Sequence, residues 1–451
     1  MRLSLFLLPV FVAGCASSWR ADLDSLRKDL DPVLDAHREL EPGPVTDAAP
    51  AVDEALAGRV GVEDVVRIAL ARNPEIGELA ARAQAMVEDV GRAGALDDPM
   101  LTFRADRVPL RNPTAFNRDA GNSAALEMRF PFPGVLELKA ESAGRQAEAM
   151  IQMLREREIE ITAMATKAWV MWANMTRQLE IHTEHVAILV EFEKISDSRF
   201  RTGKVSQQDV LKAQVELVLL QNSVVEDRRS IDTARAELNR LMNRRVDAPL
   251  GVPAEPAPNR EEFDQAALLA LADEVRPELL AAERRVRAAA AAADAAGREA
   301  TWPELLVGLE YMQMPMEDDA WGGMVGFSLP WITGKRSAEA RRMTEEQRAE
   351  RAALAAARSR VQFEVREACI RVESARKSLA LFEGELLPKS RQSVDVSRAS
   401  YEKEKSSFLD LLDAERSLRD IRLAWVQTQT AYATAVADLE RAVGGDIRRN
   451  K

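Results

Sequence analysis

The sequence contains only two cysteines, Cys15 and Cys369, and only three histidines in 451 residues. This scarcity excludes a disulfide-stapled domain and a zinc site of the usual cysteine and histidine spacing. Aromatic residues make up 5% of the chain, and no apolar run reaches the roughly 18 residues that a membrane-spanning helix needs. Any membrane contact must therefore come from strands or from an attached lipid.

The motifs of common enzymes are also missing. The sequence has no Gly-rich phosphate loop after a strand and no nucleophile elbow, so we expect no enzyme activity and no cofactor. The net charge of −11 argues against a nucleic-acid surface. Ala, Glu, Arg and Leu dominate instead, which is the composition of long packed helices.

The N-terminus carries an export signal. Residues 1–14 contain a basic residue, the apolar run Leu3–Val12 and two small residues, which predicts a cleaved signal peptide. The four residues that end at Cys15 (VAGC) are similar to a bacterial lipobox, which implies acylation of Cys15. The alternative is an ordinary signal peptide that happens to contain a cysteine. Residues 15–60 are rich in Pro, Asp and Ala with weak periodicity, and we expect them to form a lipid-anchored tether.

The rest of the chain is an internal duplication. Phe200–Gln214 (FRTGKVSQQDVLKAQ) and Tyr401–Glu415 (YEKEKSSFLDLLDAE) align at an offset of 201 positions. Pro74 and Pro277, 203 positions apart, start similar helices. Each of the two aligned stretches lies between very long helical patterns and is expected to form the tip of a helical hairpin. We assign the first repeat to residues 61–250, the second to residues 251–445 and a tail to residues 446–451.

Both tips contain the pattern of a helix start. Ser206 and Ser407 are expected to be N-caps, with Asp209 and Asp410 at the third helical position, as in a capping box. Capping explains these two acids near the positive end of the helix dipole. It leaves Asp413, one turn further on, without a local role.

Two pairs of predicted strands interrupt the helical pattern, and in each strand apolar side chains alternate with polar or small ones over about 10 residues. One explanation is a sheet whose apolar face packs on helices. Membrane-spanning strands are favoured, because aromatic residues fall near the strand ends. Four strands cannot close a barrel, so several chains would have to share one. The expected strands are Leu101–Asp106, Leu126–Phe132, Leu305–Met312 and Trp321–Trp331.

A helical pattern of unusual length follows each strand pair. Residues 137–199 and 335–403 would each extend about 95–100 Å as a single helix, and shorter partners follow at residues 206–243 and 407–443. Pro388 lies inside the second long helix and is expected to kink it or to mark a packing irregularity.

This duplicated order of elements and four further motifs resemble the TolC family of outer-membrane efflux proteins. The motifs are FPFPG (Phe130–Gly134), SLPWITGKR (Ser328–Arg336), ELNRLMN (Glu237–Asn243) and DLERAVG (Asp438–Gly444). The resemblance covers about residues 60–445 and implies a homotrimer in the outer membrane of a Gram-negative bacterium. It implies a mostly α, α+β fold, in which long antiparallel helical hairpins form an α-barrel through the periplasm. Four transmembrane β-strands per chain would contribute to a 12-stranded trimeric β-barrel.

The same resemblance implies roles for the two tips. Two acids one turn apart line the periplasmic mouth in this family, and the matching residues are Asp410 and Asp413, whose copies would form cation-selective rings. In the first repeat Lys212 stands where the second acid would be. The implied partners are a periplasmic adaptor and an inner-membrane pump of the resistance-nodulation-division type. The adaptor-docking residues would be Arg201, Gly203, Lys204, Ser206, Lys403, Lys405 and Ser407.

The segment Met312–Trp321 (MQMPMEDDAW) is similar to the heavy-metal (CzcC- and CusC-like) branch of the family. The thioethers of Met312, Met314 and Met316 suit soft ions such as Cu(I) or Ag(I). The alternative is an apolar rim that lines the exit of the barrel.

Three further sets of residues have structural explanations. His182 and His185, three residues apart on a helical pattern, have the geometry for a metal pair but are expected to be solvated surface. Trp169 and Trp172 are expected to pack in the helical bundle, and Cys369 to be buried and inert.

We therefore expect a passive, trimeric, lipid-anchored exit duct, with heavy-metal cations as the favoured cargo. One alternative is the same duct serving multidrug efflux or type I secretion. Another is a structural periplasmic coiled-coil lipoprotein that forms no pore.

Overall fold

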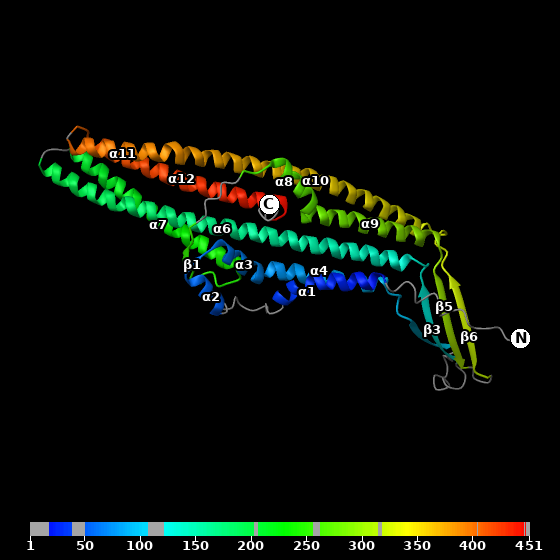
Figure 1. Ribbon diagram of the computed structural model, residues 1–451. Helices are drawn as coiled ribbons and strands as arrows, with labels where there is room; N and C mark the ends of the chain where they lie inside the picture. Colours follow the sequence, from blue (N-terminus) through cyan, green and yellow to red (C-terminus); the bar gives the residue numbers. More distant parts are fainter. Residues whose placement is uncertain are drawn as a thin grey trace. The chain divides into compact units, whose positions relative to one another are not determined.

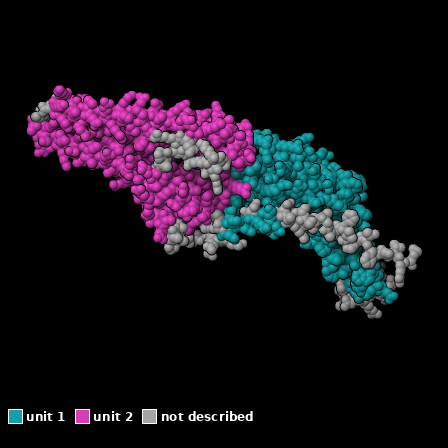
Figure 2. Space-filling view, in the orientation of Figure 1, with its two compact units in different colours: residues 1–35, 78–154, 277–358 teal, residues 36–77, 155–276, 359–451 magenta. Residues whose placement is uncertain are grey.

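The computed structural model describes residues 18–37, 50–106, 121–202, 206–255, 262–313, 318–403, 405–445 and 447. The predicted signal peptide, Cys15 and all but one residue of the predicted tail lie outside this described part. The chain forms two compact units, each of which takes segments from both sequence repeats (Figure 2). Unit 1 comprises residues 1–35, 78–154 and 277–358, and unit 2 comprises residues 36–77, 155–276 and 359–451.

Unit 1 contains a four-stranded antiparallel sheet in the order β2-β3-β5-β6 (Figure 1). Leu126 pairs with Leu101 on one side and with Leu309 on the other, and Val307 pairs with Val325. Because paired residues point to the same face, the alternating apolar residues of all four strands share one face. The strands are β2 (Met100–Asp106), β3 (Gly121–Phe130), β5 (Leu305–Gln313) and β6 (Ala320–Phe327).

The shared apolar face of the sheet is exposed. Phe103, Trp321 and Val325 are 76%, 70% and 65% exposed, although large apolar side chains of a sheet that packs on helices would be buried. The first explanation of the alternating pattern is therefore wrong for these residues. An exposed band of apolar and aromatic side chains is what lipid-facing strands present.

Two strands end earlier than predicted. β3 stops at Phe130 and β6 at Phe327, whereas the alternation of apolar residues continues to Phe132 and Trp331. Prolines follow both ends, and a proline has no N–H to donate to the neighbouring strand.

Part of the segment predicted as a tether is helical, which its weak periodicity did not indicate. The helix α1 (Ser18–His37) lies in unit 1, apart from its last two residues. Arg27 of α1 donates two hydrogen bonds, of 3.1 and 2.6 Å, to the Glu88 carboxylate of α4 (Pro74–Gly94). The buried residues of α1 include Leu23, Leu26 and Leu30, at the spacing of one helix face.

The predicted long helices are present (Figure 1), and their bounds are close to the predicted ones. In the first repeat, 67 residues form a single helix of about 100 Å, at 1.5 Å per residue. α11 and α12 form the antiparallel hairpin of the second repeat. The bounds are α6 (Val135–Arg201), α7 (Gln207–Leu241), α10 (Lys335–Leu381), α11 (Leu387–Glu402) and α12 (Phe408–Val443).

The irregularity predicted at Pro388 is a π-helical segment, Phe382–Leu386, between α10 and α11. The backbone N–H of Leu387 donates to the carbonyl of Phe382, five residues earlier. A proline cannot donate the usual bond and its ring crowds the preceding turn, so a wider turn accommodates it without breaking the helix.

The shorter elements complete the two units. Trp169 of α6 donates to the carbonyl of Val60 at 2.9 Å, and Trp172 is fully buried, which confirms that both pack in the bundle. Among the described residues, no helix combines the length and the hydropathy needed to cross a membrane. The remaining elements are α2 (Pro50–Ala57), α3 (Val62–Arg72), α8 (Gln265–Val275), α9 (Pro277–Thr301) and the parallel pair β1 (Arg59–Val60) and β4 (Val252–Pro253).

Candidate functional site

Both hairpin tips end in the capping box that the sequence predicts. The Ser206 hydroxyl accepts from the backbone N–H of Asp209 at 3.3 Å, and the Asp209 carboxylate accepts from the backbone N–H of Ser206 at 3.0 Å. In the second tip the equivalent distances between Ser407 and Asp410 are 3.2 and 2.9 Å. The Ser407 N–H and hydroxyl lower the pKa of the Asp410 carboxyl below its ordinary value, so this group stays ionised.

Asp413 is exposed on α12 and lies with Asp410 along a groove of about 640 Å³ at the tips of α7 and α12. The structure thus brings the two predicted gate acids to one surface. Lys212 of α7 is exposed and lines the same groove. The apolar lining residues are Leu211, Val215, Leu219, Leu409 and Leu412.

An aromatic cluster packs around the start of α12 in the second tip. The ring of Phe408, the first residue of α12, meets Phe192 edge-on at 5.7 Å between centroids and lies 6.0 Å from the Tyr401 ring. The Arg199 guanidinium lies 4.3 Å from the centroid of the Tyr401 ring, a cation–π contact. With the buried Leu411, these side chains attach the start of α12 to α6 and α11.

A buried carboxylate that sequence reasoning missed links the two hairpins. The Glu216 side chain on α7 is 10% exposed and accepts from Arg416 at 2.6 Å and from Arg419 at 2.8 Å, both on α12. Arg416 also lines the groove that contains Asp413. The three-residue spacing of the two arginines places them on one helix face, but nothing local indicates that the acid opposite them is buried.

The histidines of α6 are buried, so the expectation of solvated surface is wrong. The Nδ1 atom of His182 lies 2.6 Å from the carboxylate of Asp227 on α7. His185 is 4% exposed, and burial, reinforced by the positive charges of Arg422 and Arg419, lowers its pKa to about 4. Both rings face neighbouring helices of the bundle, which the sequence pattern of α6 alone does not reveal.

The predicted docking residues lie at or next to the tips where the structure describes them. Arg201 ends α6 and pairs with Asp197 at 2.8 Å, Lys403 caps α11, and the Lys405 backbone N–H donates to Ser400 at 2.9 Å. Ser206 and Ser407 serve as N-caps. Gly203 and Lys204 lie outside the described residues.

The predicted methionine site is described only in part. Met312 lies near the end of β5, paired with Ser123 and Ala320, whereas Met314 and Met316 lie outside the described residues. Within the described ranges, no group of three or more His, Cys, Asp or Glu side chains is placed to hold a metal ion. Cys369 is half-buried, and burial raises the pKa of its thiol.

Comparison with known proteins accounts for this combination of strands, long hairpins and acidic tip. Residues 65–244 and 268–445 match the family described as outer membrane efflux protein. The chain is 25% identical over 377 residues to outer membrane protein OprJ of Pseudomonas aeruginosa, covering 76% of this chain and 77% of OprJ.

Solved structures share the fold. A membrane protein from Pseudomonas aeruginosa superposes with a TM-score of 0.74 at 20% identity, over 90% of this chain and 95% of that one. CusC gives a TM-score of 0.74 at 18% identity, over 90% and 97%. The open state of the MtrE outer membrane channel of Neisseria gonorrhoeae gives 0.69 at 20% identity, over 89% and 94%.

The fold class expected from the sequence, helical hairpins that form an α-barrel plus strands that contribute to a trimeric β-barrel, is the fold of these channels and is confirmed. The family match spans both sequence repeats and includes the capped tips with Asp410 and Asp413. The chain therefore belongs to the outer membrane efflux protein family, whose members are channels of efflux systems and not enzymes.

Proposed function

We propose that this outer-membrane efflux channel is a passive exit duct that selects cations at its periplasmic mouth. Family members are trimers that work with an adaptor and an inner-membrane pump. The observation that carries the proposal is the position of Asp410 and Asp413, which lie one turn apart on the exposed tip of α12.

The electrostatic argument follows from trimer symmetry. Three copies of each acid around one axis would form two stacked rings of carboxylates. Such rings, facing a narrow aperture, would raise the local concentration of cations and favour their entry. The lowered pKa of Asp410 keeps its ring charged at the pH of the periplasm.

We further propose heavy-metal cations as the cargo, drawing on Met312 at the end of β5 and on the resemblance of Met312–Trp321 to the heavy-metal branch of the family. Met314 and Met316 would extend this thioether site. Lipophilic drugs are the second candidate cargo, since the same duct could serve multidrug efflux. Loss of tolerance to copper or zinc, but not to drugs, after deletion of the gene supports the metal cargo, and the reverse result supports the drug cargo.

The remaining parts of the proposal concern attachment. Acylation of Cys15 would anchor the chain to the outer membrane. The adaptor would dock at the tips through Arg201, Gly203, Lys204, Ser206, Lys403, Lys405 and Ser407. Metabolic labelling with a radioactive fatty acid should mark the wild-type protein and not Cys15→Ser. Equal labelling of both proteins would contradict the proposal that Cys15 is acylated.

The selectivity test uses purified trimers in planar bilayers under a salt gradient. Asp410→Asn keeps an oxygen that accepts from the Ser407 N–H, and Asp413→Asn removes the second charge without touching the cap. The double variant should shift the reversal potential toward zero, whereas the matched control Asp232→Asn, an exposed acid further along α7, should not. An unchanged reversal potential in the double variant would remove both acids from the gate.

A further inference from the structure

The end of α12 opposite to the tip is attached to the bundle by a buried cation. Arg276 lies between α8 and α9 and is 2% exposed. An arginine is rarely buried without partners, because removing its charge from water is costly. The side chain therefore marks a position where several backbone and carboxylate oxygens must converge.

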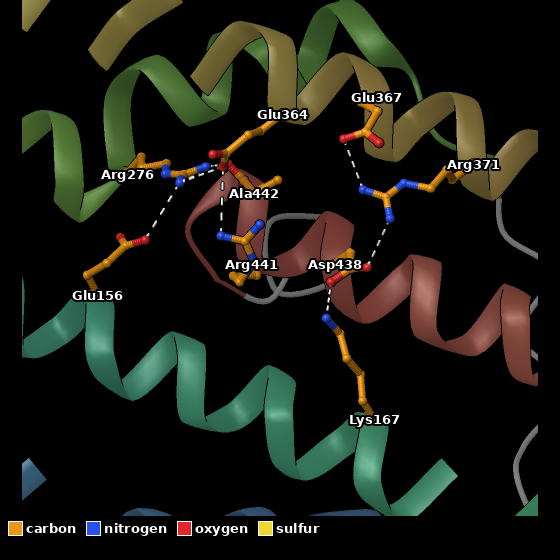
Figure 3. A network of polar contacts seen from close by, with 9 residues as sticks. All are labelled: Glu156, Lys167, Arg276, Glu364, Glu367, Arg371, Asp438, Arg441 and Ala442. Atoms are coloured by element: carbon orange, nitrogen blue, oxygen red, sulfur yellow. Dashed lines mark hydrogen bonds and ion pairs between the residues drawn. The ribbon is translucent and has the colours of Figure 1, made fainter. Parts of the chain in front are cut away.

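Three elements supply those oxygens (Figure 3). The Nη1 atom of Arg276 donates to the carbonyl of Ala442 near the end of α12 at 2.6 Å. Its Nη2 atom donates to the Glu364 carboxylate of α10 at 2.8 Å and lies 3.7 Å from Glu156 of α6. One guanidinium thus joins α12 to the long helices of both repeats.

Further ion pairs hold the last two turns of α12 (Figure 3). Arg441 lies 3.7 Å from the same Glu364 carboxylate. Asp438, one turn earlier, pairs with Lys167 of α6 and lies 3.4 Å from Arg371 of α10.

The chain also passes very close to Arg276 after α12. Gly444 ends the helix with a φ of +104°, and a Cβ atom added there would lie 2.9 Å from the Cα atom of Arg276. A glycine therefore permits both the left-handed turn and the close approach of the two backbones.

In the first repeat an asparagine stands in the position of Arg276. Asn73, the residue before Pro74, donates to the carbonyl of Leu241 near the end of α7 at 3.1 Å. Its position matches that of Arg276 before Pro277, and Leu241 matches Ala442 at the 201-residue offset.

The buried arginine at the end of α7, Arg244, instead donates to Asn239 of α7 itself at 2.8 Å. Both repeats thus have the bond to the helix end. In the second, Arg276 also joins the carboxylates of Glu364 and Glu156 on two other helices, and these contacts of Arg276 are called the clamp.

We propose that Arg276 is a positioning residue for the gate: it fixes the far end of α12, so that the acidic tip moves by tilting about this fixed end. The tip lies about 50 Å away along the helix, at 1.5 Å per residue, so a small tilt at the clamp becomes a large displacement at the mouth. Without the clamp, α12 slides and rotates, and the resting position of the tip is lost. This inference rests on the proposed gate function of the α12 tip.

Two measurements on the full trimer test the clamp. In wild-type protein, amide hydrogen exchange near the end of α12 (residues 434–443) should be at least ten-fold slower than at the equivalent end of α7 (residues 233–242). In Arg276→Met, exchange at residues 434–443 should accelerate at least ten-fold, and Glu364→Gln should accelerate it less, because the bond to Ala442 remains.

The gate is read out by single-channel recording in planar bilayers. Arg276→Met should shorten the mean closed time several-fold at an unchanged yield of trimers, an effect that a loss of stability alone would not produce. The matched control is Arg358→Met, which breaks the exposed pair of Arg358 with Glu283 and should leave exchange and closed time unchanged. If Arg276→Met does not assemble, Arg276→Lys keeps the charge, loses the fork of donors and should show a smaller change in the same direction.

The outcomes separate the two proposals. Equal exchange at the two helix ends, or wild-type closed times in every assembled Arg276 variant, overturns the clamp. A wild-type trimer that conducts no ions overturns the proposed function, while the exchange comparison still decides whether Arg276 holds α12.

Discussion

The two hairpin tips start with the same bonds and differ one turn later. Ser206 with Asp209 and Ser407 with Asp410 form equivalent capping boxes, whereas the next acid of the second tip, Asp413, is matched by Lys212 in the first. The duplication therefore preserved the residues that start each helix and let the exposed charge diverge. The capping box is common to the two tips, whereas the proposed gate is formed by the second tip alone.

The largest effect is expected when the ion pairs of Glu216, which join the two hairpins, are removed. In Glu216→Ala, Arg416 and Arg419 lose their shared carboxylate, and the 13%-exposed Arg419 is left without its strongest partner. We expect the free energy of unfolding to fall by about 3 kcal/mol per protomer, the usual cost of breaking a buried ion pair. A lower unfolding temperature of the trimer would report this loss. Glu226→Ala breaks the exposed pair with Arg229 and should change it little. Equal effects would show that Glu216 does not link the hairpins.

The first hairpin should be the acid-sensitive one, because the buried His185 has its pKa lowered to about 4. As pH falls below about 6.5, the unfolded chain binds a proton at this histidine and the folded chain does not. Stability is therefore full above pH 6.5 and is lost as pH falls toward 4.

Thermal unfolding between pH 7.5 and 4.5 checks this sign. His185→Gln should flatten the dependence on pH, and the groups that face the ring, Arg419 and Arg422 on α12 with Glu184 and His182 on α6, remain in that variant. A dependence as steep as that of the wild type would assign the acid sensitivity to other groups.

The caps allow a matched test of what the tips share. Ser206→Ala and Ser407→Ala each remove one cap and should each cost about 1 kcal/mol, measured as the unfolding temperature. The two losses should agree closely, since the capping distances agree within 0.1 Å. A much larger loss at Ser407 would mean that the second tip depends on its cap for more than the helix start.

The smallest effect is expected from a change of charge at Lys212 in the first tip. Lys212→Asp gives the first tip the second acid that it lacks and should slightly increase cation selectivity, because the new charge faces the same groove as Asp410 and Asp413. Reversal potentials in bilayers measure it, with Lys405→Asp at the other tip as the matched charge change. A decrease in cation selectivity would contradict the assignment of the ring to this groove.

Local patterns were enough to predict most of the fold. The starts of α7 and α12 follow from Ser206 and Ser407, and the starts of α4 and α9 follow from Pro74 and Pro277, since caps and prolines act on adjacent residues. The four strands follow from alternation alone. The spacing of Asp410 and Asp413 by one turn needed only helix geometry, whereas their predicted place at the mouth came from the family resemblance.

The predictions that failed concern contacts between distant segments. The burial of His182 depends on Asp227, 45 residues away, and that of Glu216 depends on two arginines about 200 residues away. The leucines of α1 had a helical spacing, but Pro32 and the polar composition concealed it. Such features depend on which helices become neighbours, and a periodic pattern does not encode that choice.

The π-helical turn at Phe382–Leu386 has a consequence for how the duplication evolved. Gly134 and Gly334, both with positive φ, precede the long helices and lie 200 positions apart, whereas the tip serines lie 201 apart. The second repeat therefore has one residue more than the first between these two points. Its buried positions Val372, Leu379, Leu387, Val394 and Tyr401 follow intervals of seven, eight, seven and seven, and the single interval of eight spans the wide turn. The π-helical turn thus accommodates the additional residue, and the buried stripe continues in register on both sides of it.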